Sequence, residues 1–162
     1  MNSRNKIVGL KKLKGIIQRL RRKGQTIAFT NGCFDLLHIG HVSYLEAAKG
    51  NKRVLIIGMN SDASVRKIKG KDRPIVSQQE RSRVLASLGC VDYVTIFNDE
   101  TPLNVIKTLR PDVLIKGADW KTKEVVGARE VVATGGKVEF IKYLDNFSTT
   151  NLIKKIQGMC VS

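Results

Sequence analysis

Short apolar runs and amphipathic segments alternate along the whole chain. The clearest run is Val54-Leu55-Ile56-Ile57-Gly58-Met59, which is continuously apolar instead of alternating with polar residues. A continuous run of this length is typical of a parallel strand that is buried on both faces. The first run ends in Asn31-Gly32, a pair typical of turns. The five predicted strands are 26–30, 54–59, 93–97, 113–116 and 138–141.

The segments before, between and after these runs carry helix signals. Residues 1–24 place apolar side chains at intervals of three and four, which is the spacing of one helix face. Ser77, with Glu80 three residues later, predicts a capping box at a helix start. Segment 60–74 is polar and rich in lysine, so we expect it to be a loop. The predicted helices are 1–24, 39–49, 77–88, 102–109, 124–134 and 148–156.

Five strands separated by helices predict an α/β fold with a Rossmann-like five-stranded parallel sheet, right-handed connections and helices on both faces. The 162 residues are enough for a single domain of this kind. We expect residues 25–162 to form it and residues 1–24 to be a basic amphipathic N-terminal helix. Ligands of such sheets bind at the carboxyl ends of the strands, near the point where the strand order reverses. The loops after the strands are therefore the segments to search for chemistry.

Charge raises one further question about partners. The net charge is +15, and residues 1–24 hold nine basic side chains and no acidic one. Such a segment can attract nucleic acid or an anionic surface. Because its apolar positions are those of an amphipathic helix, we interpret the basic residues as the solvated face of that helix. No nucleic-acid partner is expected, and a non-catalytic basic nucleic-acid binder remains a distant alternative.

The cysteines and the hydropathy pattern bear on location. Cys33, Cys90 and Cys160 are far apart and lack the CxxC spacing of a zinc site. We therefore expect no metal held by protein ligands, and a reducing cytoplasm suits the free thiols. No apolar stretch reaches the roughly 18–20 residues of a membrane span, and no apolar segment of a secretory signal follows the basic start. A cytoplasmic protein without a membrane partner is the expectation.

The strongest chemical signal follows the first predicted strand. Both histidines of the chain, His38 and His41, stand three residues apart where a helix is expected to begin, and Gly40 lies between them. At this spacing two imidazoles share one helix face. The free N–H groups of a helix start attract anions, and a glycine lets a phosphate approach the backbone. The segment predicts a triphosphate site that stabilises charge on a phosphorus under attack, with two structural histidines as the alternative.

Residues 30–41 resemble the signature of the HIGH-motif nucleotidyltransferase superfamily. Other stretches extend the resemblance to the adenylyltransferases of ADP-heptose synthesis, in a stand-alone form, over about residues 10–157. These stretches are Asn60-Ser61-Asp62, Lys69-Gly70, Arg73-Pro74, Glu80-Arg81, Lys116-Gly117-Ala118-Asp119-Trp120 and Ser148-Thr149-Thr150.

The resemblance implies a reaction and its participants. AMP would pass from ATP to D-glycero-β-D-manno-heptose 1-phosphate, giving ADP-heptose and pyrophosphate for lipopolysaccharide core biosynthesis. Mg²⁺ would accompany ATP, and related enzymes are commonly homodimers. A sugar phosphate is already anionic near neutral pH, so the reaction needs no general base. Catalysis would depend on positioning and on neutralisation of charge.

The resemblance also implies roles for single residues. The catalytic residues would be His38, His41 and Lys69. The nucleotide would contact Gly32, Cys33, Phe34, Gly40, Lys116, Gly117, Asp119, Ser148, Thr149 and Thr150. The sugar phosphate would contact Asp35, Asn60, Asp62, Arg73 and Arg81. From residue type alone, Lys69 and its neighbours Lys67 and Lys71 would belong to a solvated loop. Asp119 would belong to a turn, and Ser148 would be a helix cap. Asn146 stands where the family usually has glycine, and asparagine tolerates left-handed backbone.

Two other enzyme classes share parts of this pattern. Cytidylyltransferases that act on glycerol 3-phosphate or another alcohol phosphate have the same H-x-G-H and Ser-Thr-Thr segments, so the choice between ATP and CTP stays open. A fragment of a class I aminoacyl-tRNA synthetase is disfavoured, because the chain has no Lys-Met-Ser-Lys-Ser segment. The usual phosphate loops, G-x-x-x-x-G-K-[ST] and G-x-G-x-x-G, are also absent.

Overall fold

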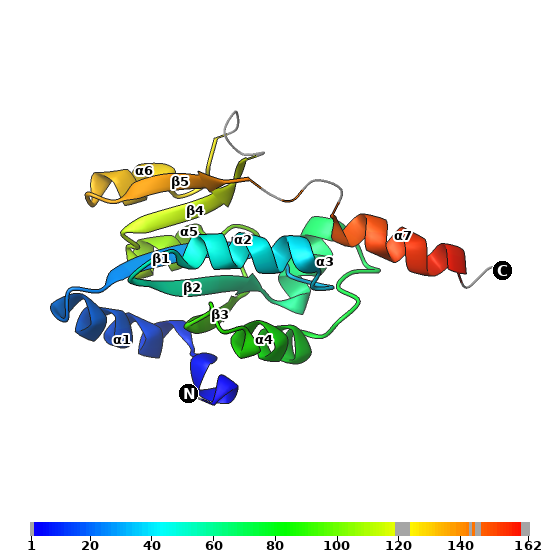
Figure 1. Ribbon diagram of the computed structural model, residues 1–162, viewed down its shortest axis with the longest axis horizontal. Coiled ribbons are helices and arrows are strands. Elements are labelled where there is room, and N and C mark those ends of the chain that lie inside the picture. The colour runs from blue at the N-terminus through cyan, green and yellow to red at the C-terminus, as the bar shows by residue number, and fades with distance from the viewer. Residues whose placement is uncertain (1, 119–123, 143, 145–146, 160–162) are drawn as a thin grey trace.

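A computed structural model describes residues 2–118, 124–142, 144 and 147–159, and shows one parallel sheet with strand order β3-β2-β1-β4-β5 (Figure 1). All four neighbouring pairs of strands are parallel. The predicted α/β class and Rossmann-like sheet are therefore confirmed. The strand order reverses between β1 and β4, so this junction is where a ligand is expected. The strands are β1 (Thr26–Gly32), β2 (Arg53–Asn60), β3 (Tyr93–Phe97), β4 (Val113–Gly117) and β5 (Lys137–Ile141).

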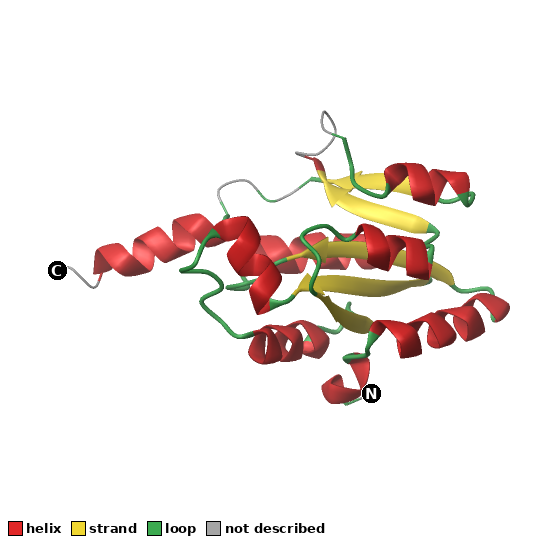
Figure 2. Cartoon of the chain, turned by 180° about the vertical axis from the view of Figure 1, so that it is seen from behind, coloured by secondary structure: helices red, strands yellow, loops and turns green. Residues whose placement is uncertain are grey.

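Helices cover both faces of the sheet (Figure 2). A 3₁₀ turn (η1) precedes the first α-helix, and α7 extends away from the sheet with no buried residue (Figure 1). No helix in the described part of the chain is long and apolar enough to cross a membrane. The helices are η1 (Ser3–Lys6), α1 (Leu10–Arg22), α2 (Ile39–Lys49), α3 (Asp62–Lys69), α4 (Gln78–Ser87), α5 (Leu103–Leu109), α6 (Ala128–Ala133) and α7 (Thr149–Met159).

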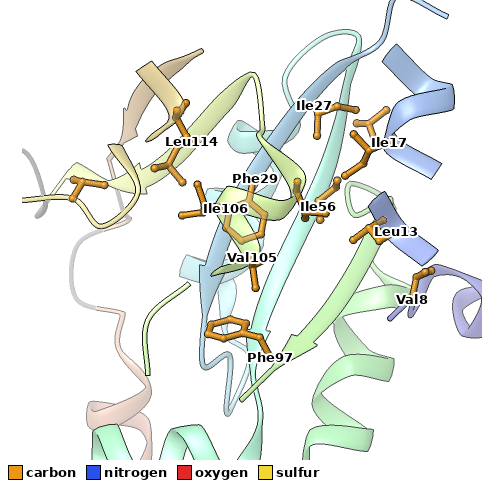
Figure 3. Close-up of a cluster of buried hydrophobic side chains, with 14 residues drawn as sticks. Val8, Leu13, Ile17, Ile27, Phe29, Ile56, Phe97, Val105, Ile106 and Leu114 are labelled. Atoms are coloured by element: carbon orange, nitrogen blue, oxygen red, sulfur yellow. The ribbon is translucent and has the colours of Figure 1, made fainter. Parts of the chain in front are cut away.

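The continuous apolar run of β2 contributes side chains to two hydrophobic cores, one on each face of the sheet. Ile56 joins α1, α5 and α6 in the cluster on one face, which also holds Phe29 and Ile106 (Figure 3). Its neighbours Leu55 and Ile57 join α2 and α4 in the cluster on the other face. Successive side chains of a strand point to opposite faces, so a strand between two cores needs apolar residues at every position.

Helix α1 is an integral part of this packing. Its Leu13 and Ile17 side chains are almost completely buried against the sheet. The basic residues Lys11, Lys12 and Lys14 lie on the exposed side of the same helix. An amphipathic helix is therefore present, but it covers Leu10–Arg22 and not the whole of the expected 1–24.

Segment 60–74, expected to be a loop, contains helix α3, so that prediction is wrong. Ser61 caps the helix, because its side chain accepts a hydrogen bond from the Ser64 N–H at 3.2 Å, and Asp62 follows in the first turn. Only Ser64 and Val65 are buried in this helix. The helix is only eight residues long and mostly polar, so it does not stand out from a loop in the sequence.

Other element bounds also differ from expectation. Asn31-Gly32 continues strand β1 and pairs with Gly58 and Met59 of β2, so it is not a turn. The helix expected over 124–134 begins only at Ala128. Gly127 precedes it with φ 85°, in the left-handed region that favours glycine, and a Cβ there would lie 2.4 Å from Ile106 Cδ1.

The capping box predicted at residue 77 is confirmed. The Ser77 hydroxyl accepts a hydrogen bond from the Glu80 N–H, and the Glu80 carboxylate accepts one from the Ser77 N–H. This pairing satisfies N–H groups that a helix start otherwise leaves open. The capping box therefore fixes the beginning of α4, and Arg81 follows Glu80 directly in this helix.

Candidate active site

The two histidines lie at the start of α2, next to the carboxyl end of β1. His38 is the N-cap residue with extended backbone, and its side chain makes no capping hydrogen bond. The His38 and His41 rings lie 3.9 Å apart between centroids, with 31° between their planes. Phe34 also packs against His41, with the ring centroids 5.4 Å apart. The predicted pair of imidazoles therefore exists as a stack at a helix start.

Burial lowers the pKa of both imidazoles. The pKa of His41 falls from 6.5 to about 4, mainly because its ring is desolvated and secondly because of the charge on His38. Burial also lowers the pKa of His38. The Nδ1 atoms of both rings are buried without a hydrogen-bond partner among the described residues. Near neutral pH the rings are therefore uncharged, and Nε2 is the nitrogen left to face a ligand.

This pKa predicts an acid sensitivity of the fold. Between pH 6.5 and about 4 the unfolded chain takes up a proton at His41 and the folded chain does not, so stability falls as pH falls. At about 1.36 kcal/mol per pKa unit the loss is at most about 3 kcal/mol, and solvent at the partly exposed ring reduces it. Urea midpoints at pH 7 and pH 5 should move closer together in His41→Gln than in the parent. Equal shifts in both proteins would contradict the lowered pKa.

Gly40 gives His38 the room for this arrangement. A Cβ at position 40 would lie 3.0 Å from His38 Nδ1 and 3.1 Å from Phe147 Cβ. We expect Gly40→Ala to weaken ATP binding about three- to tenfold, because the ring and the segment before α7 must both shift. Gly15→Ala in α1 is the control, because nothing lies within 4 Å of a Cβ there. It should add up to about 1 kcal/mol of helix stability and leave ATP affinity unchanged. Equal ATP affinity in the two variants would contradict this role of Gly40.

A cleft of about 430 Å³ opens over the carboxyl ends of β1, β2 and β4. It lies at the strand-order reversal, where α/β sheets bind ligands. The predicted site residues that line it are Gly32, Cys33, Phe34, Asp35, His41, Asn60, Lys69, Arg73, Lys116, Gly117, Thr149 and Thr150. The structure thus brings together residues from five separate segments of the sequence.

Some predicted residues lie beside the cleft or outside the described chain. His38 and Gly40 adjoin it through the stacked ring of His41. Ser148 caps α7, since its Oγ accepts a hydrogen bond from the Asn151 N–H at 3.1 Å. Asp62 and Arg81 pair with each other and do not line the cleft. The remaining positions, Asp119 with its neighbour Trp120, and Asn146, lie outside the described residues.

The Asp35 carboxylate is engaged in hydrogen bonds with other residues of the protein. It is buried, and its carboxylate accepts hydrogen bonds from Arg73 Nε at 2.6 Å and from the N–H groups of Ile75 and Val76, each at 2.9 Å. Burial would raise its pKa, but these donors and the Arg73 charge together lower it. Asp35 therefore fastens the segment before α4 to the loop after β1.

Lys116, on β4, places its ammonium group in the wall of the cleft. Its Nζ donates a hydrogen bond to Asn31 Oδ1 on the neighbouring strand. Burial lowers its pKa from 10.5 to about 8. A bound anion would favour the charged form, because opposite charges a few ångströms apart stabilise each other. Lys69 and Arg73 supply positive charge from the other side of the cleft.

The start of α7 closes the cleft next to the histidines. Thr149 Oγ1 donates a hydrogen bond to the Leu36 carbonyl at 3.4 Å, which ties this helix start to the loop after β1. Thr149 and Thr150 both line the cleft. Two helix starts, those of α2 and α7, therefore converge on one space, and each favours an anion.

Several residues of the cleft were not anticipated. Glu100 and Thr101 follow β3, and the rule that ligands meet strand ends could have found them. Tyr44 lies one helical turn after His41, and its hydroxyl is 2.8 Å from Thr30 Oγ1. Ile68 belongs to the unexpected helix α3. The full set of additional lining residues is Asn31, Tyr44, Ile68, Glu100, Thr101, Pro102 and Val126.

Comparison with known proteins defines the class of this chain as a nucleotidyltransferase enzyme. A model of the Cytidylyltransferase-like family matches residues 29–155. The chain belongs to the Cytidylyltransferase-like family. The matched residues include the second half of β1, the whole of β2 to β5 and both helix starts at the cleft.

Similar proteins narrow the comparison within the family. The chain is 51% identical over 144 residues to the bifunctional protein HldE of Syntrophotalea carbinolica. This alignment covers 89% of this chain and 29% of that protein. The chain is 54% identical over 153 residues to HldE of Paramagnetospirillum magneticum, covering 94% and 31%. The chain therefore spans about a third of the length of these relatives.

One solved structure carries the same fold at appreciable sequence identity. It is the lipopolysaccharide core biosynthesis protein from Thermoplasma volcanium, with a TM-score of 0.61 and 25% sequence identity. The match covers 75% of this chain and 98% of that one. Most of this chain thus shares its fold with nearly the whole of that protein.

Proposed function

We propose that the chain transfers AMP from ATP to D-glycero-β-D-manno-heptose 1-phosphate, giving ADP-heptose and pyrophosphate. The observation that carries the proposal is the cleft at the β1–β4 junction, where stacked imidazoles, three cationic side chains and two helix starts converge. The sequence resemblance to heptose adenylyltransferases and the identity of about half of all aligned positions with HldE proteins support the choice of sugar.

The proposed step forms one bond and breaks one. An oxygen of the sugar 1-phosphate attacks the α-phosphorus of ATP, the bond to the β-phosphate oxygen breaks, and pyrophosphate leaves. The attacking phosphate is anionic, so the residues need not remove a proton. Their work is to hold the two anions in line and to neutralise charge as it develops.

Each side of the cleft has a proposed task. Nε2 of His41, with His38 stacked behind it, donates to the oxygens of the phosphorus under attack. The starts of α2 and α7 hold the triphosphate, through Gly40 on one side and Ser148, Thr149 and Thr150 on the other. This assignment follows from the anion preference of helix starts.

The remaining lining residues divide between the two substrates. Lys116 and Gly117 on β4, with the backbone of Gly32, Cys33 and Phe34, would contact the nucleotide. Lys69 would neutralise phosphate charge as a mobile cation. Asn60 and Arg73 would hold the sugar phosphate. Asp119 stays a proposed nucleotide contact that lies outside the described residues.

Mg²⁺ is the proposed companion of ATP, and the cleft fits a lightly held ion. Two described lining residues carry carboxylates, and Asp35 is already engaged by Arg73 and two N–H groups. Although the sequence predicted no metal held by protein ligands, Glu100 lines the cleft and is the carboxylate that would hold the ion. Mg²⁺ commonly binds through one or two carboxylates, phosphate oxygens and water. When bound, it would neutralise part of the triphosphate charge.

A pyrophosphate-release screen tests the proposal. ATP and CTP are each offered with heptose 1-phosphate and with glycerol 3-phosphate, and the expected result is release only with ATP and the heptose phosphate. Release with CTP and glycerol 3-phosphate instead would replace the proposal with a cytidylyltransferase. We place the reaction in the cytoplasm, where the free thiols of Cys33 and Cys90 would stay reduced.

ATP protection of Cys33 from N-ethylmaleimide gives a second readout that does not depend on turnover. Cys33 lines the cleft and Cys90 does not, so Cys90 is an internal reference in the same sample. Burial raises the pKa of both thiols, so each has a smaller reactive thiolate fraction than an exposed cysteine. ATP should slow labelling of Cys33 alone. Equal protection of both thiols would argue against nucleotide binding in this cleft.

A further inference from the structure

Arg81 is the most deeply buried charged side chain among the described residues. It is 1% exposed, on helix α4. Its Nε donates to the Val76 carbonyl at 2.9 Å, one Nη donates to the Cys33 carbonyl, and the other donates to Asp62 Oδ1 at 2.7 Å. All three guanidinium nitrogens are therefore engaged within the protein. The sequence resemblance made Arg81 a contact of the sugar phosphate, but in this arrangement it does not reach the cleft.

The bond to the Cys33 carbonyl controls the wall of the cleft. That carbonyl belongs to the peptide between Cys33 and Phe34, and Phe34 has φ 47°, which is uncommon for a bulky residue. Strained backbone of this kind persists only where neighbouring structure holds it. The Phe34 ring packs 5.4 Å from His41 and would lie 3.0 Å from a Cβ at Gly32. Fixing the peptide plane therefore fixes the ring that packs beside His41.

The bond to Asp62 reaches a second wall. Asp62 is the first residue of α3, and Lys69 is the last residue of that helix. The Asp62 N–H also donates to Gln78 Oε1 at 3.0 Å, so α3 is joined to the start of α4 by two bonds. One guanidinium thus connects the loop after β1, the helix that carries Lys69 and the segment before α4.

We propose that Arg81 is a positioning residue, which acts through the Cys33 carbonyl and Asp62 to hold the Phe34–His41 wall and Lys69 at a fixed separation. The reaction that this geometry serves is the nucleotidyl transfer proposed above, and the inference rests on it to that extent. Asp35, in the loop after β1, separately holds the segment before α4 through Arg73, Ile75 and Val76. Two ion pairs, Asp35 with Arg73 and Asp62 with Arg81, therefore hold the walls of the cleft in place relative to each other.

Arg81→Lys is the decisive variant, because it keeps the charge but has one nitrogen where three bonds are needed. We expect kcat to fall about tenfold with a change of less than threefold in KM for ATP. N-ethylmaleimide labelling of Cys33 should become about three- to tenfold faster, with Cys90 unchanged. Arg83→Lys on the same helix is the matched control, since no hydrogen bond or ion pair of its side chain is found in the described part of the structure. It should match the parent in both measurements.

Each outcome decides a separate question. Parental kcat and parental Cys33 labelling in a folded Arg81→Lys protein would overturn the positioning role, and so would a lower kcat with unchanged labelling. If Arg81→Lys fails to fold, Asp62→Ala carries the test, because it removes the acceptor of one guanidinium bond and leaves both carbonyl bonds. It should lower kcat about threefold and speed Cys33 labelling, and parental values would again overturn the role. If the parent releases no pyrophosphate, the proposed function fails, while the labelling still decides whether Arg81 holds the loop.

Discussion

His41→Ala is expected to lower kcat for pyrophosphate release by about 10²–10³-fold while the protein stays folded. Removing one donor aimed at developing oxyanion charge typically costs this much. His41 packs against both His38 and Phe34 at the start of α2, and its Nδ1 is buried without a partner in the described structure. Nε2 is therefore the nitrogen that would serve the phosphorus. Steady-state pyrophosphate release together with thermal unfolding measures the two effects separately.

Two amide variants test which ring nitrogen acts. The amide nitrogen of glutamine can occupy the place of Nε2, and that of asparagine is closer to the place of Nδ1. His41→Gln should therefore retain at least tenfold more activity than His41→Asn. Near-parental pyrophosphate release by His41→Ala, or greater rescue by asparagine, would count decisively against the assignment.

Lys69→Ala is expected to lower kcat/KM for ATP about 10²-fold, whereas Lys67→Ala changes it less than twofold. Both lysines are exposed residues of α3, but only Lys69 lines the cleft. The two variants lose the same net charge from the same helix, so they share any effect of the overall field. Only the loss of a cation at the phosphates distinguishes them.

A salt series completes this comparison. At 0.1 M salt, charges more than about 10 Å apart are largely screened. The difference between the two lysine variants should therefore persist at moderate ionic strength. If both variants lose the same activity, and salt removes the loss, the lysines act only through general attraction and Lys69 has no place at the phosphates.

The elements that the sequence predicted well are those whose signal is local. Strand β3 and helix α2 have the predicted bounds, and the continuous apolar run of β2 correctly indicated burial on both faces. Helix α3 was missed because it buries only Ser64 and Val65, so polar residues dominate its pattern. Asn31-Gly32 was mistaken for a turn because pairing with β2 extends the strand past its apolar residues.

The same distinction holds for the site: features set by neighbouring residues in the sequence were predicted, and contacts between distant segments were not. H-x-G-H after a strand was enough to indicate a helix start that carries both imidazoles, because helix boundaries and side-chain spacing are local properties. The convergence of Lys69, Lys116 and Thr149 on one cleft depends on the strand order, which places β4 beside β1 although more than 80 residues separate them. Glu100 enters the cleft for the same reason, since it follows the edge strand β3.

The sequence by itself determined which residue types are present, where most strands and helices form, and that two imidazoles lie at a helix start. Only the tertiary structure decided which charged side chains face a ligand and which are used within the protein. Arginine and aspartate look equally available in a sequence, but Arg81 and Asp35 are buried and fully engaged, while Lys69 is exposed at the cleft. The physical reason is that a buried charge must be paired by groups that the fold brings from distant segments, and spacing along the chain carries no record of those partners.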